Sequence, residues 1–269
     1  MPAPHVPGLR RRLRSGDRLF GCFAFLPNAT AVEVLGRAGL DFVIVDLEHG
    51  GKAWETVEDM VRAAEVSGMH ALVRVPSHDP VHITHALETG AEGIVLPFVE
   101  SSEQVRRAAG SLRYAPHGTR GTCTQTRPAG FGGRRAQFVE LARQMGEELV
   151  LVGLIESRKG AQAVPDMLRL DPGLDVVMIG RSDLASDLGK PGQGSDPEVE
   201  RLTGDILSAV TAAPAACAGV AVYGAADAAQ WAQRGCRFFA YPSEVSLLFD
   251  AARRLKDDLA TACDAAPRP

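Results

Sequence analysis

Short runs rich in Val, Ile, Leu and Phe alternate with longer segments of helical periodicity along all 269 residues, and this alternation most constrains the fold. Eight such runs occur, at residues 19–26, 42–46, 71–75, 93–97, 149–155, 176–179, 218–222 and 238–241. The intervening segments predict helices at 31–38, 57–67, 81–89, 103–112, 135–145, 198–212 and 226–234, with a last helix at 245–259. Eight strand–helix units in roughly 250 residues predict an α/β protein with a TIM (β/α)8 barrel.

The barrel is predicted to be a single domain over residues 19–260. Residues 1–18 are expected to form an N-terminal extension with a helix, and the Ala- and Pro-rich residues 261–269 a flexible tail. An open doubly wound sheet is the alternative, but its first strand should lead into a glycine-rich turn. The first run is instead followed by Pro-Asn-Ala-Thr at 27–30, with no glycine before Gly36, which disfavours that fold.

Charge and composition argue against two classes of protein. The chain has 29 Lys and Arg against 33 Asp and Glu, a net charge of −4, whereas nucleic-acid binders usually carry a basic excess. No apolar run is long enough to span a bilayer. The five cysteines are scattered and form no CxxC pair, which is typical of reduced thiols. We therefore expect a cytoplasmic protein with no nucleic-acid or membrane partner.

Polar side chains follow several predicted strands at the end where TIM barrels carry their active sites. They are Asp46, Glu48 and His49 after the second strand, Arg74 at the third, Glu156 after the fifth, and Arg181, Ser182 and Asp183 after the sixth. Because the carboxyl ends of all eight strands meet at one mouth, these groups are expected to converge there.

Glu156 and Asp183 are candidate ligands of a hard divalent cation. Two carboxylates leave room for water and a bidentate substrate around an octahedral Mg²⁺ or Mn²⁺. The alternative is that each carboxylate caps a helix or pairs with an arginine. No cysteine lies at a strand end, which disfavours softer metals, although the imidazole of His49 could attract zinc.

His49 and Arg74 each allow two interpretations. His49 can accept and return a proton near neutral pH, but a buried histidine bonded to a carbonyl is the structural alternative. Arg74, at the end of an apolar strand, requires an anionic partner, which could be a substrate oxygen or the carboxylates of Asp46 or Glu48. The amides of Ser182 and Asp183 could bind a substrate carboxylate or form an ordinary helix start.

Only four lysines are present, and none lies in a predicted strand. Schiff-base catalysis, which needs a lysine inside the site, is therefore disfavoured. Two long loops, at 115–134 and 188–196, exceed the usual length for a compact domain and are candidate lids. Arg120 and Arg127 in the first loop are candidate contacts to substrate or to a neighbouring subunit, with surface solvation as the alternative.

Five ordered motifs give the chain a family resemblance. They are Asp-Leu-Glu-His-Gly at 46–50, Arg74 before Pro76, Arg-Tyr-Ala-Pro at 113–116 followed by Gly118 and Arg-Gly at 120–121, Ile-Glu-Ser at 155–157, and Ile-Gly at 179–180 before Ser-Asp-Leu at 182–184. In order and spacing, from Gly21 to Leu255, the chain resembles the HpcH/HpaI aldolase family. It is similar to the family's class II pyruvate aldolases, of the 4-hydroxy-2-oxoheptanedioate and 2-keto-3-deoxy sugar acid type.

The resemblance implies a carbon–carbon lyase that joins or cleaves a pyruvate-type enolate and an aldehyde. It implies a divalent metal cofactor, Mg²⁺ or Mn²⁺, with Co²⁺ or Zn²⁺ as further candidates, and small keto acid and aldehyde partners. It also implies a homohexamer, built as a trimer of dimers with exchanged C-terminal helices.

The resemblance further implies a role for individual residues. By this resemblance, Glu156 and Asp183 would hold the metal, and the amides of Ser182 and Asp183 would bind the pyruvate carboxylate. Arg74 would stabilise the enolate, and His49 would be the acid/base. Asp46 lies at the entrance to the metal site. Glu88 is supplied to the histidine of a neighbouring subunit, with a longer arm than the family's usual aspartate.

Two positions depart from the family pattern and bear on substrate choice. Leu154 stands where many of these aldolases have a glutamine, and Arg181 replaces the usual proline before Ser182. With Arg127, they are candidate substrate-binding residues. An added cation beside the carboxylate site makes an acidic acceptor or a specialised biosynthetic condensation an alternative to a standard hydroxy-keto acid substrate.

Three rival functions stay open. Two are enzymatic reactions on the same scaffold, a citryl or malyl thioester lyase and a metal-independent condensing enzyme. The third is a non-catalytic barrel that binds a keto acid. The joint presence of His49, Arg74 and two carboxylates argues against that third function.

Overall fold

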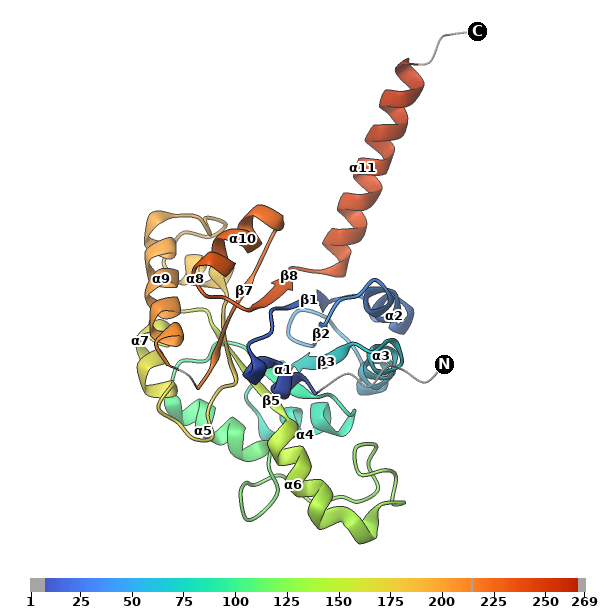
Figure 1. Ribbon diagram of the computed structural model, residues 1–269, viewed down its shortest axis with the longest axis vertical. Coiled ribbons are helices and arrows are strands. Elements are labelled where there is room, and N and C mark those ends of the chain that lie inside the picture. Colours follow the sequence, from blue (N-terminus) through green and yellow to red (C-terminus); the bar gives the residue numbers. More distant parts are fainter. Residues whose placement is uncertain (1–7, 214, 266–269) are drawn as a thin grey trace.

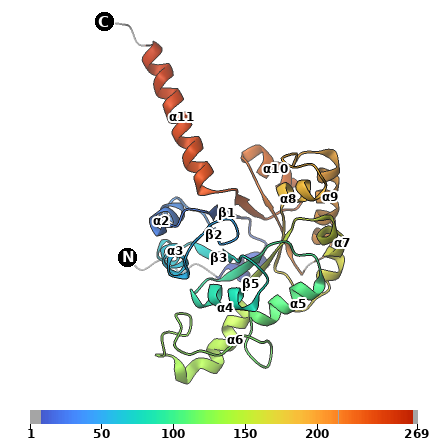
Figure 2. The ribbon, with the colours of Figure 1, turned by 180° about the vertical axis from the view of Figure 1, so that it is seen from behind.

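Eight parallel strands close into a barrel in the order of the chain, as predicted. The computed structural model describes residues 8–213 and 215–265. The strands are β1 (Leu19–Ala24), β2 (Phe42–Asp46), β3 (His70–Arg74), β4 (Gly93–Leu96), β5 (Val150–Ile155), β6 (Val176–Ile179), β7 (Cys217–Ala221) and β8 (Phe238–Tyr241). Figures 1 and 2 show them at the centre of the molecule, with helices around the outside. Strands 2, 6 and 8 have the predicted bounds.

The outer helices also follow the prediction, with two additions. They are α2 (Ala29–Arg37), α3 (Trp54–Ser67), α4 (Pro80–Glu88), α5 (Ser102–Ser111), α6 (Phe138–Glu148), α7 (Arg158–Met167), α8 (Arg181–Asp187), α9 (Pro197–Thr211) and α10 (Ala225–Gln233). The sequence did not predict α7, which contains Pro165, or α8, which is seven residues long. A proline and a short length both weaken the helical pattern. Part of the segment at 135–145 forms a 3₁₀ turn, Arg135–Gln137, before α6.

Two apolar layers hold the barrel together. Inside it, Phe42 and Phe238 stack with ring centroids 4.0 Å apart and pack with Leu72, Val152 and Met178. A larger layer lies between the outer strand faces and the helices. Glycines follow the ends of α2, α3, α4 and α10, at positions 39, 68, 90 and 235, with φ between 78° and 99°. This left-handed conformation is least costly for glycine, so these four helices end next to their glycines.

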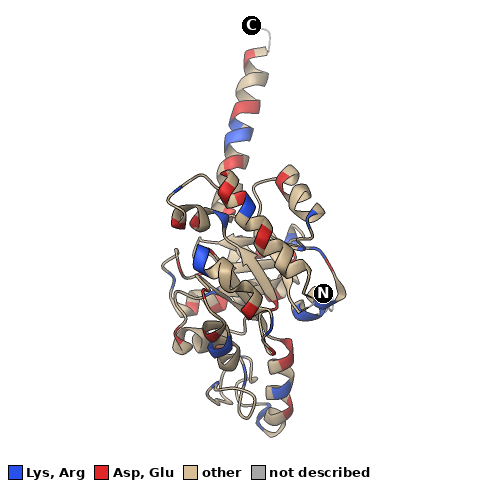
Figure 3. Ribbon diagram, turned by 90° about the vertical axis from the view of Figure 1, so that its left-hand side faces the viewer, with Lys and Arg blue, Asp and Glu red and all other residues tan. Residues whose placement is uncertain are grey.

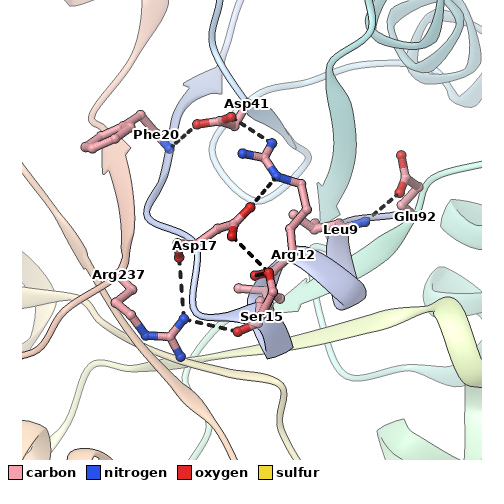
Figure 4. Close-up of polar contacts among 9 residues, drawn as sticks. Leu9, Arg12, Ser15, Asp17, Phe20, Asp41, Glu92 and Arg237 are labelled. Atoms are coloured by element: carbon pink, nitrogen blue, oxygen red, sulfur yellow. Dashed lines mark hydrogen bonds and ion pairs between the residues drawn. The ribbon is translucent and has the colours of Figure 1, made fainter. Parts of the chain in front are cut away.

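The N-terminal helix α1 (Leu9–Ser15) closes the end of the barrel opposite the mouth. Leu9 and Leu13 are buried with the interior layer. Arg12 donates to Asp17 over 3.0 Å and to Asp41 over 2.7 Å, and Asp41 accepts the amide of Phe20. Figure 4 shows these contacts. The predicted N-terminal helix is therefore a packed part of the barrel.

The C-terminal helix α11 (Glu244–Ala265) projects away from the barrel (Figures 1 and 2). Lys, Arg, Asp and Glu are spaced along it (Figure 3), between exposed apolar residues. The tail was predicted to begin at residue 261, but the helix continues to Ala265, because nothing breaks the helical pattern before Pro267. Residues 266–269 of that predicted tail lie outside the described residues. Among the described helices, none is both long and apolar enough to cross a membrane.

We expect Arg12→Ala to lower the free energy of unfolding by about 1–3 kcal/mol, because Asp17 and Asp41 would lose a shared charged donor. Arg11→Ala is the matched control on the same helix, since Arg11 is exposed, and it should change stability by less than about 0.5 kcal/mol. Urea unfolding followed by circular dichroism measures both. Equal stability of the two variants would contradict the role of Arg12 in attaching α1.

Candidate active site

Side chains from several strand ends surround one cavity of about 170 Å³ at the mouth of the barrel. It is lined by the predicted residues His49, Arg74, Leu154, Glu156, Arg181, Ser182 and Asp183, together with residues that include Phe23 and Tyr223. The expected convergence of strand ends at the mouth is therefore found for these residues. Their individual contacts separate the interpretations that the sequence left open.

Arg74 is held by a bidentate ion pair with Asp46. The two residues are partners in the β2–β3 register, and Arg74 Nε and Nη2 each donate to one oxygen of Asp46 over 2.7 Å. Glu48 Oε2 lies 2.9 Å from Arg74 Nη1, and the ring of Phe23 lies 4.8 Å from the guanidinium carbon. The structural ion pair expected for Arg74 is therefore present, and the side chain also lines the cavity.

Asp46 shapes the turn that carries the next two polar residues. Its Oδ1 accepts the amide of Glu48 over 3.0 Å, and its Oδ2 accepts the amide of His49 over 3.4 Å. Lys52 donates to the Asp46 carbonyl over 2.6 Å. Both carboxylate oxygens of Asp46 are thus committed to Arg74 and to this turn. In this structure Asp46 positions its neighbours and lies 0 % exposed beneath them.

Glu156 is buried, and the backbone around it accommodates its carboxylate. Its Oε2 accepts the amide of Phe98 over 3.0 Å, and Phe98 adopts a left-handed φ of 44°, which is strained for a bulky residue. A Cβ at Gly180 would lie 2.7 Å from Glu156 Oε1, so that position needs glycine. Burial is the largest cause that raises the pKa of Glu156 to about 7, and the nearby carboxylates of Asp183 and Glu48 contribute to this value, whereas the Phe98 amide and the charge of Arg74 oppose the shift.

Glu156 and Asp183, the two predicted metal ligands, would supply two carboxylates, which is fewer ligands than a complete metal site needs. Within residues 8–213 and 215–265, no three His, Cys, Asp or Glu side chains are grouped as a metal site. Water and substrate oxygens would have to supply the remaining ligands, as is common for Mg²⁺. A buried carboxylate whose pKa is raised fits a cation, because a bound cation would remove the cost of its negative charge.

His49 lies at the rim of the cavity with its side chain 56% exposed. Its Nε2 is 3.8 Å from Glu48 Oε2. The alternative of a buried histidine bonded to a carbonyl is therefore wrong. An exposed imidazole that faces the cavity can exchange protons with both solvent and a bound molecule.

The contacts of Arg181 differ from those of the free cation expected beside the carboxylate site. Its Nη2 donates to Asp227 over 2.9 Å and to the Ala221 carbonyl over 3.1 Å, and its guanidinium lies 4.9 Å from the ring of Trp231. The charge expected beside the carboxylate site is therefore neutralised by Asp227, a residue that sequence proximity could not indicate. Ser182 does reach the cavity, where its hydroxyl is 3.3 Å from that of Tyr223.

Glu88 and Arg127 lie outside this chain's own mouth. Arg120 donates to Glu88 over 2.7 Å, and Arg127 donates to the Thr89 carbonyl over 3.1 Å and pairs with Glu65. Arg127 was expected to bind substrate, but here it ties the long loop to α3 and α4. A role for Glu88 beside a histidine requires a neighbouring subunit, as the resemblance implies.

Sequence reasoning named Glu48 only as a residue at the mouth and a possible ion-pair partner of Arg74, and it did not identify Tyr223. Glu48 stands between two predicted residues in the Asp-Leu-Glu-His motif, and its position there was a usable signal. Burial raises the pKa of Glu48, and the charge of Arg74 opposes this shift. Tyr223 lies two residues beyond β7, where a residue can reach the mouth. Leu154 is buried with the interior layer of the barrel and also lines the cavity.

Comparisons with known proteins agree with this architecture. The model of the HpcH/HpaI aldolase/citrate lyase family matches residues 19–251. The hydroxypyruvate/pyruvate aldolase of Roseovarius nubinhibens is 32% identical over 254 residues, covering 94% of this chain and 96% of that protein. The 5-keto-4-deoxy-D-glucarate aldolase of Citrobacter koseri is 33% identical over 237 residues, covering 88% of this chain and 90% of that protein.

A solved structure is also similar over nearly its whole length. The citrate synthase SbnG superposes with a TM-score of 0.83 at 28% identity, covering 96% of this chain and 98% of that one. Family model, relatives and fold therefore agree. The chain belongs to the HpcH/HpaI aldolase/citrate lyase family.

Proposed function

We propose that the mouth of this barrel catalyses aldol cleavage or condensation between a pyruvate-type enolate and an aldehyde, assisted by a divalent metal ion. The observation that carries this proposal is the arrangement of Arg74, His49 and Glu156 around one small cavity. A cation, an acid/base and a buried carboxylate are the groups that enolate chemistry needs. The names of the two aldolase relatives support the same reaction.

Glu156 and Asp183 are the residues proposed to hold the metal ion, which we expect to be Mg²⁺ or Mn²⁺, with Co²⁺ or Zn²⁺ as further candidates. A divalent ion there would supply Lewis acidity to the oxygen atoms of the keto acid. The amide of Phe98 orients Glu156, and Gly180 leaves space for its carboxylate. The protein thus prepares the metal-binding carboxylate through backbone geometry.

Arg74 is proposed to stabilise the negative charge that develops on the enolate oxygen. A guanidinium has five N–H groups, and Asp46 and Glu48 engage three of its nitrogens without using every hydrogen. The ion pair with Asp46 prevents the side chain from rotating away. A pre-oriented charge costs no reorganisation when the oxyanion forms.

His49 is proposed to move the proton in both directions. In cleavage it accepts the proton of the substrate hydroxyl, directly or through water, and returns it to the enolate carbon, which becomes the methyl group of the keto acid. In condensation it removes a methyl proton of the keto acid and donates it to the aldehyde oxygen. Glu48 Oε2 lies 3.8 Å from its Nε2 and is the carboxylate next to it within this chain. Glu88 of a neighbouring copy is proposed as a further acidic partner of this histidine.

The acceptor aldehyde is proposed to be neutral. The amides of Ser182 and Asp183 are assigned to the carboxylate of the donor, as the resemblance implies. Arg181 would be the cation for an acidic acceptor, but Asp227 pairs with it at 2.9 Å and Glu200 lies at 3.7 Å. Leu154 adds an apolar surface. An acidic acceptor would therefore meet no free guanidinium from Arg181.

A condensing reaction like that of a citrate synthase is the second candidate, favoured by the similarity to SbnG. A thioester lyase is distinguished by a requirement for coenzyme A, and a metal-independent enzyme by indifference to chelators. A non-catalytic barrel would bind pyruvate without exchanging its methyl protons.

We also propose a cytoplasmic location, which the five free cysteines support.

A homohexamer with exchanged C-terminal helices is proposed for the assembly. The apolar side chains of α11 recur at helical spacing and are exposed, as Val245, Leu248, Phe249, Leu255 and Leu259. An exposed apolar stripe on a projecting helix is stable in water only when a partner covers it. A second copy of this chain is the proposed partner.

The first prediction from this proposed function concerns enolate formation. With Mn²⁺, the protein should exchange the methyl protons of pyruvate for deuterium, as measured by NMR, and a chelator should stop the exchange. His49→Ala should slow it by about 10²–10⁴-fold because the proton acceptor is lost. His85→Ala is the matched control, since His85 is an exposed residue of α4. Exchange that continues at an equal rate in His49→Ala would contradict the assignment.

The second prediction concerns the pKa of Glu156. Below pH 7 its carboxylate is protonated, so metal binding must release that proton. Affinity for Mn²⁺, measured by calorimetry, should rise about tenfold per pH unit up to about pH 7 and then level off. Glu156→Gln should bind weakly and lose this component of the pH dependence. The same affinity at pH 5.5 and pH 7 in the unmodified protein would refute the proposed coupling.

The third prediction concerns α11. Light scattering after gel filtration should give a mass about six times 28.6 kDa. Leu248→Glu with Phe249→Glu should yield smaller particles, because charges on the stripe cannot be buried without cost. Asp258→Ala, on the same helix, is the control. A monomeric unmodified protein would rule out the proposed assembly.

A further inference from the structure

A second cavity, of about 830 Å³, lies at the end of the barrel opposite the mouth. Its walls come from α1, α6, the segment 113–117 and the loop with Asp171 and Pro172. These segments precede β1, β5 and β6 or follow α5, so they lie at the amino ends of the strands. The volume falls within the range of small-molecule sites, and TIM-barrel catalysis does not use this face.

Four arginines line this cavity, and two of them are already paired. Arg10 donates to Asp175 over 2.7 Å, and Arg143 pairs with Glu140 and Glu147 at 2.6 Å each. The acidic groups on the α6 wall are thus engaged by Arg143. The remaining two, Arg14 and Arg113, form no ion pair with any residue that the structure describes.

Arg113 is the more informative of these two. It is half-buried, and its Nη1 donates to the Ala109 carbonyl over 2.7 Å. Burial lowers the pKa of Arg113, and the neighbouring charge of Arg10 lowers it further, whereas Asp175 and Asp171 oppose this shift. A partly desolvated guanidinium beside a second guanidinium is costly without a bound anion. An anionic group would remove that cost through charge-assisted hydrogen bonds.

The rest of the wall is largely apolar. Tyr114 and Phe138 meet edge to face with ring centroids 5.3 Å apart, and Pro116, Ala142 and Pro172 complete this side. A bare inorganic anion would leave most of the cavity unfilled. A ligand with a flat apolar body and one acidic group would contact both the apolar wall and the arginines. An apolar lining with a few polar groups is typical of specific small-molecule sites.

We propose that this cavity binds a small organic anion, with its carboxylate or phosphate at Arg113 and Arg14 and its apolar body against Tyr114 and Phe138. The planar fork of arginine accepts either acidic group. Asp171, His117 and Tyr114 are the other titratable groups on the wall that lie outside these ion pairs. This site does not depend on the proposed aldol reaction, because the two cavities share no lining residue.

Calorimetry on the full chain tests the proposal with three probes of one shape: phenylacetate, phenyl phosphate and the neutral phenylacetamide. At least one of the two anions should bind, and the stronger one identifies the acidic group that the site prefers. Phenylacetamide should bind at least about tenfold more weakly, because it lacks the charge. Equal binding of phenylacetamide, or no binding of either anion at 10 mM, would overturn the proposal.

Variants locate the bound anion. Arg113→Met keeps much of the side-chain length but removes the charge, and it should weaken binding by about tenfold or more. Ala142→Trp should also weaken binding by occupying the cavity from α6, and it decides the question if Arg113→Met does not fold. Arg11→Ala, outside the cavity on the same helix as Arg14, should leave binding unchanged. Binding that is unaffected by both cavity variants would place the anion elsewhere and refute the site.

Discussion

The bidentate ion pair between Arg74 and Asp46 is the contact on which the mouth of this barrel depends. It joins the last residues of two neighbouring strands, and both side chains are buried. Removing one partner of such a pair leaves an uncompensated charge, which typically costs about 3–5 kcal/mol. Because Asp46 also accepts the amides of Glu48 and His49, the pair sets the turn that presents the acid/base candidate.

On the opposite side of the mouth, buried charge is less well compensated. Glu156 is buried with one amide donor and two further carboxylates nearby, and the backbone around it is strained at Phe98. Local backbone strain and buried charge both lower stability, and proteins retain them mainly at functional sites. The proposed metal ion would resolve this imbalance. The mouth therefore combines an ion-paired half around Arg74 with an acidic half whose negative charge the proposed metal ion would neutralise.

The two ends of the barrel differ in how they are completed. Helix α1 covers the amino ends of the strands through Leu9, Leu13 and Arg12, and beside it remains the arginine-lined cavity. At the other end of the chain, α11 extends outward with an exposed apolar stripe. The proposed second copy of this chain would bury that stripe.

The amino-acid sequence by itself determined the eight strands, most of the helices, the glycine helix ends and the placement of His49, Arg74, Glu156 and Asp183 at the mouth. These features follow from periodicity and strand order, which are local, and barrel closure then brings the strand ends together. Only the tertiary structure decided which charges neutralise one another. Arg181 pairs with Asp227, 46 residues away, and Arg120 with Glu88, 32 residues away. Such pairs depend on how loops and helices pack, because the side-chain partner that lies within 4 Å is not encoded by sequence spacing.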